Sequence, residues 1–182
     1  MSDQQEEKMR GDAHDDDLFK QLAALIGRLD AETRETLSRS MPMGELFVDR
    51  WERARALGFG ENSSIYASAL VFGDVNVGSD TWIGPSAILD GVGGLTIGDN
   101  CSISAGVQIY THDTVNWAVS GGQAEKETAP TAIGSRCYIG PNTVIAMGVA
   151  IGDGCVIGAC SLVLDDIPAG SKAFGTPCRV IG

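Results

Sequence analysis

Aromatic and basic residues are both scarce in this chain of 182 residues. Aromatic side chains make up 6 % of the sequence, and no Lys or Arg occurs between residues 56 and 125. The formal net charge of −11 argues against nucleic acid or an anionic membrane surface as the main partner. No apolar run reaches the roughly 18 residues that a membrane span needs, and the acidic start contains no apolar signal core.

Closely spaced cysteine pairs of the CxxC type are also missing. The five cysteines are an odd number, and without an export signal we expect reduced thiols in a cytoplasmic protein. His14 stands beside three aspartates, but a segment without apolar periodicity fixes no ligand geometry. We therefore expect no metal site.

The first third of the chain differs in composition from the rest. Residues 1–17 are rich in Asp and Glu and have no apolar pattern, which predicts an acidic disordered tail. Residues 18–60 predict a helical cap, because Leu and Ile recur at helical spacing from residue 18 to residue 29.

Two further helix boundaries are expected within this cap. Asp30 is suited to cap a second helix over residues 31–39, since acidic residues come early in that segment and Arg39 ends it. A third helix is expected over about residues 45–57, because Gly58 follows it.

From residue 65 an aliphatic residue recurs every six residues. The positions are Ile65, Val71, Val77, Ile83, Leu89, Ile97, Ile103, Ile109, Ile133, Ile139, Ile145, Ile151, Ile157 and Val163. The repeat slips by two residues after Leu89 and pauses after Ile109, yet its register is preserved. A fixed internal period of this kind indicates a solenoid.

Six residues suit a short strand followed by a corner, so the repeat predicts a mainly β fold. We expect about four to five coils of about 18 residues over residues 61–170, followed by a C-terminal tail, residues 171–182. The aliphatic residue points inward, and so does the residue four positions later, which must be small. Cys101, Cys137 and Cys155 fall in this small slot and are expected to act as compact hydrophobes. The helices should cover the open edge of the first coil.

The pause in the repeat predicts a long excursion loop, residues 113–131, on an otherwise regular solenoid. Such loops are more often functional than accidental. His112 is the last residue before the loop and the only His outside the acidic tail. An imidazole that a loop can shield from water is suited to act as a general base. Asp113 and Glu127 are both candidates for orienting it, and the sequence does not choose between them.

Two residues are candidates for contacting the acceptor. Asp90 follows Leu89 on the face that also carries Ile109, one coil below His112. The slip after Asp90 predicts a bulge that opens near His112, so we expect Asp90 to contact the acceptor or help to position its nucleophile. Trp117, within the excursion loop, is suited to provide an apolar wall, and equally suited merely to pack the loop.

In these features the chain resembles the hexapeptide-repeat acyltransferases over about residues 60–182. It looks most like the subgroup that contains galactoside and maltose O-acetyltransferases and the acetyltransferases of surface-polysaccharide synthesis. The resemblance is carried by IYTHD (109–113), the AP that ends the excursion (129–130), the repeats of residues 132–170 and GTPCRVIG (175–182).

The resemblance implies a left-handed parallel β-helix. It also implies that His112 is the general base, that acetyl-CoA supplies the acyl group, and that a homotrimer forms active sites between neighbouring subunits. The acceptor would be a sugar or a nucleotide-linked sugar, and no metal would be needed. Where many relatives have Thr-Lys, this chain has Leu164 and Asp165, so a cation that is often near CoA is missing.

Several residues are candidates for holding CoA. They are Tyr138, Ala146, Gly148, Ala159, Lys172 and Arg179. Arg179 lies in the C-terminal segment that resembles the family and is the first choice for contacting phosphate. Counting by coils places Gly148 above His112, and a valine there is expected to block acyl-CoA without unfolding the protein.

Two alternative functions remain open. A non-catalytic β-helix could scaffold an assembly, although a scaffold has no need of a His at the mouth of a long loop. An acetyltransferase could also act on a non-sugar acceptor such as serine. A γ-type carbonic anhydrase is excluded, because its zinc site needs three His and this chain has one outside the tail.

Overall fold

The computed structural model describes residues 13–181, which divide into two compact units between Phe47 and Val48. The first unit contains helix α2 (Ala13–Leu37) and the short helix α3 (Met43–Leu46). Among the described residues, no helix is long and apolar enough to cross a membrane.

Helix α2 corrects two expectations from the sequence. It continues through Asp30, whose carboxylate pairs with the guanidinium of Arg34 one turn later instead of capping a new helix. It also begins at Ala13, so residues 13–17 of the predicted tail are helical, while residues 1–12 lie outside the described part.

The expected third helix is interrupted. Helix α3 ends at Leu46, and helix α4 (Arg50–Ala56) begins after Asp49, whose carboxylate accepts hydrogen bonds from two N–H groups of its first turn. Helix α4 packs on β1 (Ser64–Ile65) and so covers the first coil. The placement of α2 and α3 against the coils stays a prediction.

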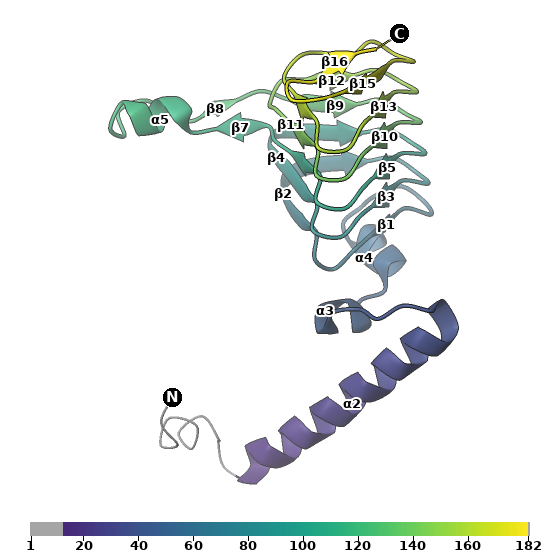
Figure 1. Ribbon diagram of the computed structural model, residues 1–182. Helices are drawn as coiled ribbons and strands as arrows, with labels where there is room; N and C mark the ends of the chain where they lie inside the picture. Colours follow the sequence, from purple (N-terminus) through teal and green to yellow (C-terminus); the bar gives the residue numbers. More distant parts are fainter. Residues whose placement is uncertain (1–12, 182) are drawn as a thin grey trace. The chain divides into compact units, whose positions relative to one another are not determined.

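The second unit is a mainly β solenoid, a parallel β-helix, whose coils are stacked along one axis (Figure 1). One face is a seven-stranded sheet of β1, β3 (Trp82–Ile83), β5 (Ser102–Ile103), β10 (Tyr138–Ile139), β13 (Val156–Ile157), β15 (Lys172–Phe174) and β16 (Arg179–Val180). All of these strands are parallel except β16. Six coils therefore begin along this face, more than the four to five expected. The segment predicted as a tail contributes β15 and β16.

Two further faces share one sheet, because the long strands β2 (Leu70–Val77) and β4 (Ile88–Ile97) turn a corner of the solenoid. The start of β4 pairs with β6 (Gln108–Ile109), which is followed by β11 (Val144–Ile145) and β14 (Leu162–Val163). The end of β4 pairs with β9 (Thr131–Ile133), which pairs with β12 (Ala150–Ile151).

The register of these strands confirms the repeat. Ile139 pairs with Ile157 one regular coil later, whereas Ile83 pairs with Ile103, a step longer by the two-residue slip. Ile109 pairs with Ile145 across the whole excursion, so the chain leaves the solenoid and returns to the same register.

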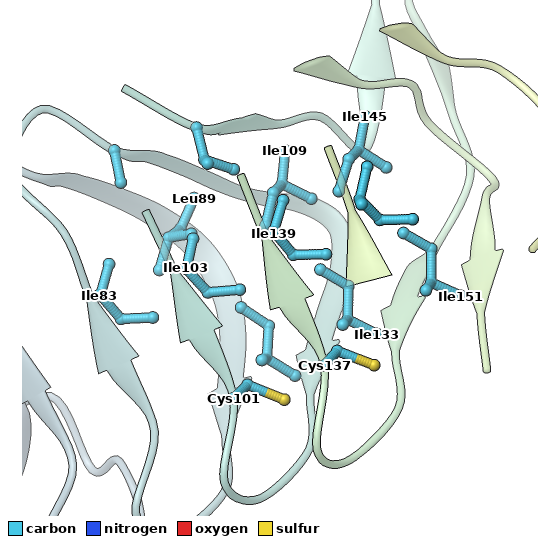
Figure 2. Close-up of a cluster of buried hydrophobic side chains, with 14 of the residues drawn as sticks. Ile83, Leu89, Cys101, Ile103, Ile109, Ile133, Cys137, Ile139, Ile145 and Ile151 are labelled. Carbon is cyan, nitrogen blue, oxygen red and sulfur yellow. The ribbon is translucent and has the colours of Figure 1, made fainter. Parts of the chain in front are cut away.

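The core consists of the inward aliphatic side chains stacked in columns (Figure 2). Every aliphatic position of the repeat is buried apart from Val71, which is half-buried. Cys101, Cys137 and Cys155 are buried in the small slot, as the sequence predicts. Burial raises the pKa of the Cys155 thiol, so this residue stays protonated and packs as an apolar group.

Two adjacent residues of β13 test the role of the columns. Ile157 is fully buried, whereas Val156 points outward and is 40 % exposed. Ile157→Ala should lower the free energy of unfolding by about 2–5 kcal/mol, because it leaves a cavity inside the stack. Val156→Ala, the matched control, should change it by less than about 1 kcal/mol. Denaturant unfolding measures both values, and equal losses would contradict the assignment of inward and outward positions.

Candidate active site

The excursion forms an arm, residues 112–130, that projects from the solenoid (Figure 1). Strand β7 (His112–Asp113) pairs antiparallel with β8 (Glu127–Thr128), and helix α5 (Val115–Val119) lies towards the tip. Thr131 is already part of β9 and is buried, so the chain has rejoined the sheet by that residue. The excursion thus starts and ends one residue earlier than predicted.

The slip in the repeat is a bulge of β4, residues 92–94, which directly follows Asp90 and Gly91 and lies next to the base of the arm. It lies against the bulge of β2, where the register shifts between Gly73 and Val75. A Cβ on Gly91 would lie 2.3 Å from the carbonyl oxygen of Asp74, and one on Gly93 would lie 2.4 Å from that of Thr111. Only glycine allows this close approach of backbones, which brings the bulge after Asp90 against both the neighbouring coil and the strand that leads to His112.

Asp90 contacts His112 directly. Its Oδ2 lies 2.5 Å from Nδ1 of the imidazole and accepts a hydrogen bond from the Thr111 N–H at 2.9 Å. Its Oδ1 accepts a hydrogen bond from the Val92 N–H at 2.8 Å. The Asp90 side chain is 0 % exposed, whereas that of His112 is 26 % exposed. The site therefore combines a buried, fully bonded carboxylate with an imidazole that solvent or a ligand can reach.

The hydrogen bonds keep Asp90 ionised despite its burial. Burial alone would raise the pKa of this carboxyl, but the N–H groups of Thr111 and Val92 and the imidazole of His112 outweigh that effect. The pKa of Asp90 therefore lies below its ordinary value. A carboxylate in this state accepts the Nδ1–H of a neutral imidazole and leaves Nε2 as the basic nitrogen.

This geometry corrects the expected roles of the acidic residues. Asp113 accepts a hydrogen bond from the Val115 N–H, and Glu127 accepts one from the Asn116 side chain, so both carboxylates are used within the arm. Asp90 takes the place beside the imidazole that the sequence had left to one of them. Since Asp90 is completely buried, it has no surface to offer an acceptor in this conformation.

Trp117 and His112 lie apart within one chain. Trp117 is on α5 towards the tip of the arm and is 52 % exposed, whereas His112 is at the base of the arm (Figure 1). An acceptor wall from Trp117 therefore requires a second copy of the chain or a movement of the arm.

His112, Ala146 and Gly148 lie on one corner of the solenoid, between the faces of β11 and β12, which we call the His112 corner. The pairing of Ile109 with Ile145 puts residues 146–148 one coil above the start of the arm. The nearest side chain to Gly148 is that of Ala129, whose Cβ would lie 3.2 Å from an added Cβ. Gly148 has a φ of +80°, where a β-branched residue is strained, so Gly148→Val should destabilise the fold, which the count of coils did not predict.

The other CoA candidates lie at three places. Tyr138 and Lys172 point outward from the seven-stranded face, in one column with Val156. Ala159 is exposed at another corner, above Gly140. Arg179 extends to Asp165 at the top of the His112 corner, with 3.6 Å between Nη1 and Oδ2. Arg179 is thus the one charged candidate that the described structure brings to the same corner as His112.

Thr111 is a residue that the sequence analysis missed. The six-residue pattern assigns buried positions to residues 109 and 113, yet Thr111 is 0 % exposed and bonds to the bulge. The sequence contains only a weak indication of this role, which is that a small hydroxyl residue follows a strand and directly precedes the candidate base.

The low pKa of Asp90 gives the protein a pH-dependent stability. The pKa is lower in the folded protein than the ordinary value of 3.8, so the carboxylate stabilises the fold above that pH. This contribution is lost as the pH falls through the folded-state pKa. Asp90→Asn should therefore lower the unfolding free energy by about 1–3 kcal/mol at pH 7, and the difference from the unmodified protein should shrink below about pH 4.

Denaturant unfolding between pH 7 and pH 3 measures this difference. Asp74→Asn, on the exposed side of the neighbouring bulge, is the control and should change the unfolding free energy little at either pH. A loss for Asp90→Asn that stays constant down to pH 3 would contradict the ionised state of Asp90.

Two stretches of the chain match models of protein families. Residues 74–111 match the hexapeptide repeat of succinyl-transferase, and residues 130–165 match the bacterial transferase hexapeptide model of six repeats. Both stretches lie within the solenoid.

Curated relatives match part of the chain. Galactoside O-acetyltransferase of Escherichia coli K12 is 39 % identical over 95 residues, which are 48 % of this chain and 47 % of that protein. The putative colanic acid biosynthesis acetyltransferase WcaF of the same strain is 31 % identical over 111 residues, 59 % of this chain and 57 % of that protein. The chain thus spans about half the length of the curated relatives it matches.

Solved structures match more of the chain. A hexapeptide-repeat acetyltransferase from Vibrio cholerae, solved with acetyl coenzyme A, is 29 % identical with a TM-score of 0.64, covering 90 % of this chain and 87 % of that one. A maltose O-acetyltransferase from Clostridium difficile is 26 % identical with a TM-score of 0.53 and the same coverage. Together with the solenoid and its repeat, these matches show that the chain contains hexapeptide repeats and is similar in sequence and fold to hexapeptide-repeat transferases of bacteria.

Proposed function

We propose that the protein is an acetyl-CoA-dependent acetyltransferase that acts on a hydroxyl or amine of a sugar or nucleotide-linked sugar, in the synthesis of a surface polysaccharide. The contact between His112 Nδ1 and the buried Asp90 carboxylate is the observation that carries the proposal. The names of the relatives support the acceptor class, since they act on galactosides or belong to colanic acid biosynthesis. The Vibrio cholerae complex supports acetyl-CoA as the donor.

In the proposed reaction His112 is the general base. Asp90 holds the tautomer with hydrogen on Nδ1, so Nε2 is free to take the proton of the acceptor as it attacks the thioester carbonyl. The imidazolium that forms is stabilised by the ionised Asp90 and then returns the proton to the departing thiolate of CoA. The acyl group moves directly from sulfur to the acceptor.

The His112 corner is the proposed path of the acyl donor. Ala146 and Gly148 are small residues on the coil above His112, and Arg179 lies at the upper end beside Asp165. Arg179 and Asp165 are 65 % and 80 % exposed, so this ion pair is weak and the guanidinium can exchange it for a phosphate.

A homotrimer with sites between neighbouring subunits is part of the proposal. Large apolar side chains point outward from the solenoid, including Leu70 at 57 % and Trp82 at 63 % exposure, and such surfaces favour contact with another protein surface. The projecting arm would then reach the site of a neighbouring subunit. A non-catalytic scaffold, or an enzyme acting on serine, is the alternative that the activity assays below separate from this function.

Removal of the proposed base should abolish most of the activity. His112→Ala should lower turnover by about 10²–10⁴-fold, the range for losing a positioned general base, while binding of CoA is retained. Release of free CoA thiol, measured in a screen of sugar, nucleotide-sugar and serine acceptors, identifies the acceptor and gives the rates. His14→Ala, which removes the only other imidazole of the chain, is the control. Near-full turnover of His112→Ala would exclude His112 as the base.

Arg179 should affect the binding of acetyl-CoA and not the binding of the acceptor. Arg179→Ala should raise the KM for acetyl-CoA about tenfold with little change in turnover, because it removes one charge-assisted contact of about 1.5 kcal/mol. Arg136→Ala is the matched control, since Arg136 also pairs with an exposed carboxylate, Asp153, but at a different corner. Equal KM values for both variants would remove Arg179 from the donor site.

A further inference from the structure

Thr111 connects the strand that carries His112 to Asp90 and to the bulge that follows Asp90. Its hydroxyl donates a hydrogen bond to the carbonyl oxygen of Asp90 at 2.9 Å and accepts one from the Gly93 N–H at 2.8 Å. Its own N–H donates to the carboxylate of Asp90, and its carbonyl oxygen accepts from the Ala129 N–H at 3.0 Å. One residue thus bonds Asp90, the bulge that follows it and the returning strand of the arm.

The Thr111 hydroxyl bonds backbone groups that strand pairing leaves without partners at this point. A bulge interrupts the ladder of backbone hydrogen bonds, so its buried C=O and N–H groups need other partners. A single hydroxyl supplies a donor and an acceptor in the space of one atom, and a methyl group of the same size supplies neither. Without it, the buried Asp90 carbonyl and the half-buried Gly93 N–H would lose these bonds.

We propose that Thr111 is a positioning residue that fixes the hydrogen on Nδ1 of His112 by holding the bulge, and with it the Asp90 carboxylate, in place. The role rests on the proposed function, because the fixed tautomer is what leaves Nε2 ready to accept a proton. Thr111 touches neither the acceptor nor the thioester, since it is completely buried. It acts through Asp90.

A purely structural role for Thr111 predicts a different outcome. Thr143 is equally buried, and its hydroxyl donates to the carbonyl oxygen of Gly158 at 3.0 Å, on another corner of the solenoid. Thr143→Val therefore removes a comparable hydroxyl and is the matched control for Thr111→Val. Both substitutions should destabilise the fold, but only Thr111→Val should disturb the imidazole.

The first experiment reads the tautomer directly and needs no activity. His14→Gln leaves His112 as the only His of the full chain, so two-bond ¹H–¹⁵N correlations of ¹⁵N-histidine report this ring alone. The parent, Thr143→Val and Thr111→Ser should show Nδ1 protonated and Nε2 unprotonated. Thr111→Val should show averaged nitrogen shifts from exchanging tautomers. An unchanged spectrum for Thr111→Val, or an averaged one for Thr111→Ser, would overturn the proposal.

A second variant covers the case in which Thr111→Val does not fold. Thr111→Ala removes the same hydroxyl without adding a methyl group against the bulge, and the same loss of the fixed tautomer is expected. If Thr111→Ala keeps the Nδ1–H of the parent, the proposal is wrong.

The second experiment tests whether the tautomer of His112 affects turnover. With the acceptor found by thiol release, Thr111→Val should lower turnover about 10–100-fold at unchanged KM for acetyl-CoA, and Thr111→Ser should restore most of it. Adding Thr111→Val to Asp90→Asn should lower turnover little further, because both act through one carboxylate. Additive losses would overturn the proposal. A chain that fixes the tautomer yet transfers no acetyl group would refute the proposed function alone.

Discussion

The stacking of inward aliphatic residues in register is the constraint on which the rest of this structure depends. Ile103 lies between Ile83 and Ile139, and Ile109 lies between Leu89 and Ile145, so every coil must return to the same column (Figure 2). Extra residues are tolerated only where they leave the strands in register, which means at corners. The two insertions of this chain, the bulge of β4 and the arm, occur on successive coils at one corner. The candidate site lies where both departures from the repeat meet.

Burial of a carboxylate at that meeting point costs free energy, and the cost is offset locally. Asp90 is 0 % exposed and accepts hydrogen bonds from the N–H groups of Thr111 and Val92 as well as contacting His112. Regular coils hold Ala, Val, Thr, Ser or Cys at their inward small positions, and such side chains are neutral. Packing of the core therefore does not require a carboxylate at position 90. Its ionised state suits the role of general base that we propose for His112.

The repeat made the solenoid predictable from sequence, since columns such as Leu89 and Ile109 follow from counting alone. Counting also placed Asp90 one coil below His112. It did not predict their contact, because Asp90 lies directly before a bulge and His112 at the start of the arm, and both insertions depart from the repeat. Counting could not assign a role to Asp113 or Glu127 either, since both belong to an antiparallel arm outside the repeat. Each bonds to a neighbour within that arm. At Asp30 the cap signal was outweighed by a helix that continues and pairs Asp30 with Arg34.

The position of His112 is controlled from the solenoid, although the residue belongs to the arm. It pairs with Thr128 as the first residue of β7, but its side chain is held by Asp90 from the coil below. The base of the arm is bonded to the same coils, because Ala129 donates to the carbonyl of Thr111 and the hydroxyl of Thr131 donates to that of Tyr110 at 2.8 Å. The outer part of the arm, with α5 and Trp117, can therefore move or change in sequence without displacing the imidazole. In the function that we propose, the groups that would transfer protons are thereby separate from the segment that would adapt to an acceptor.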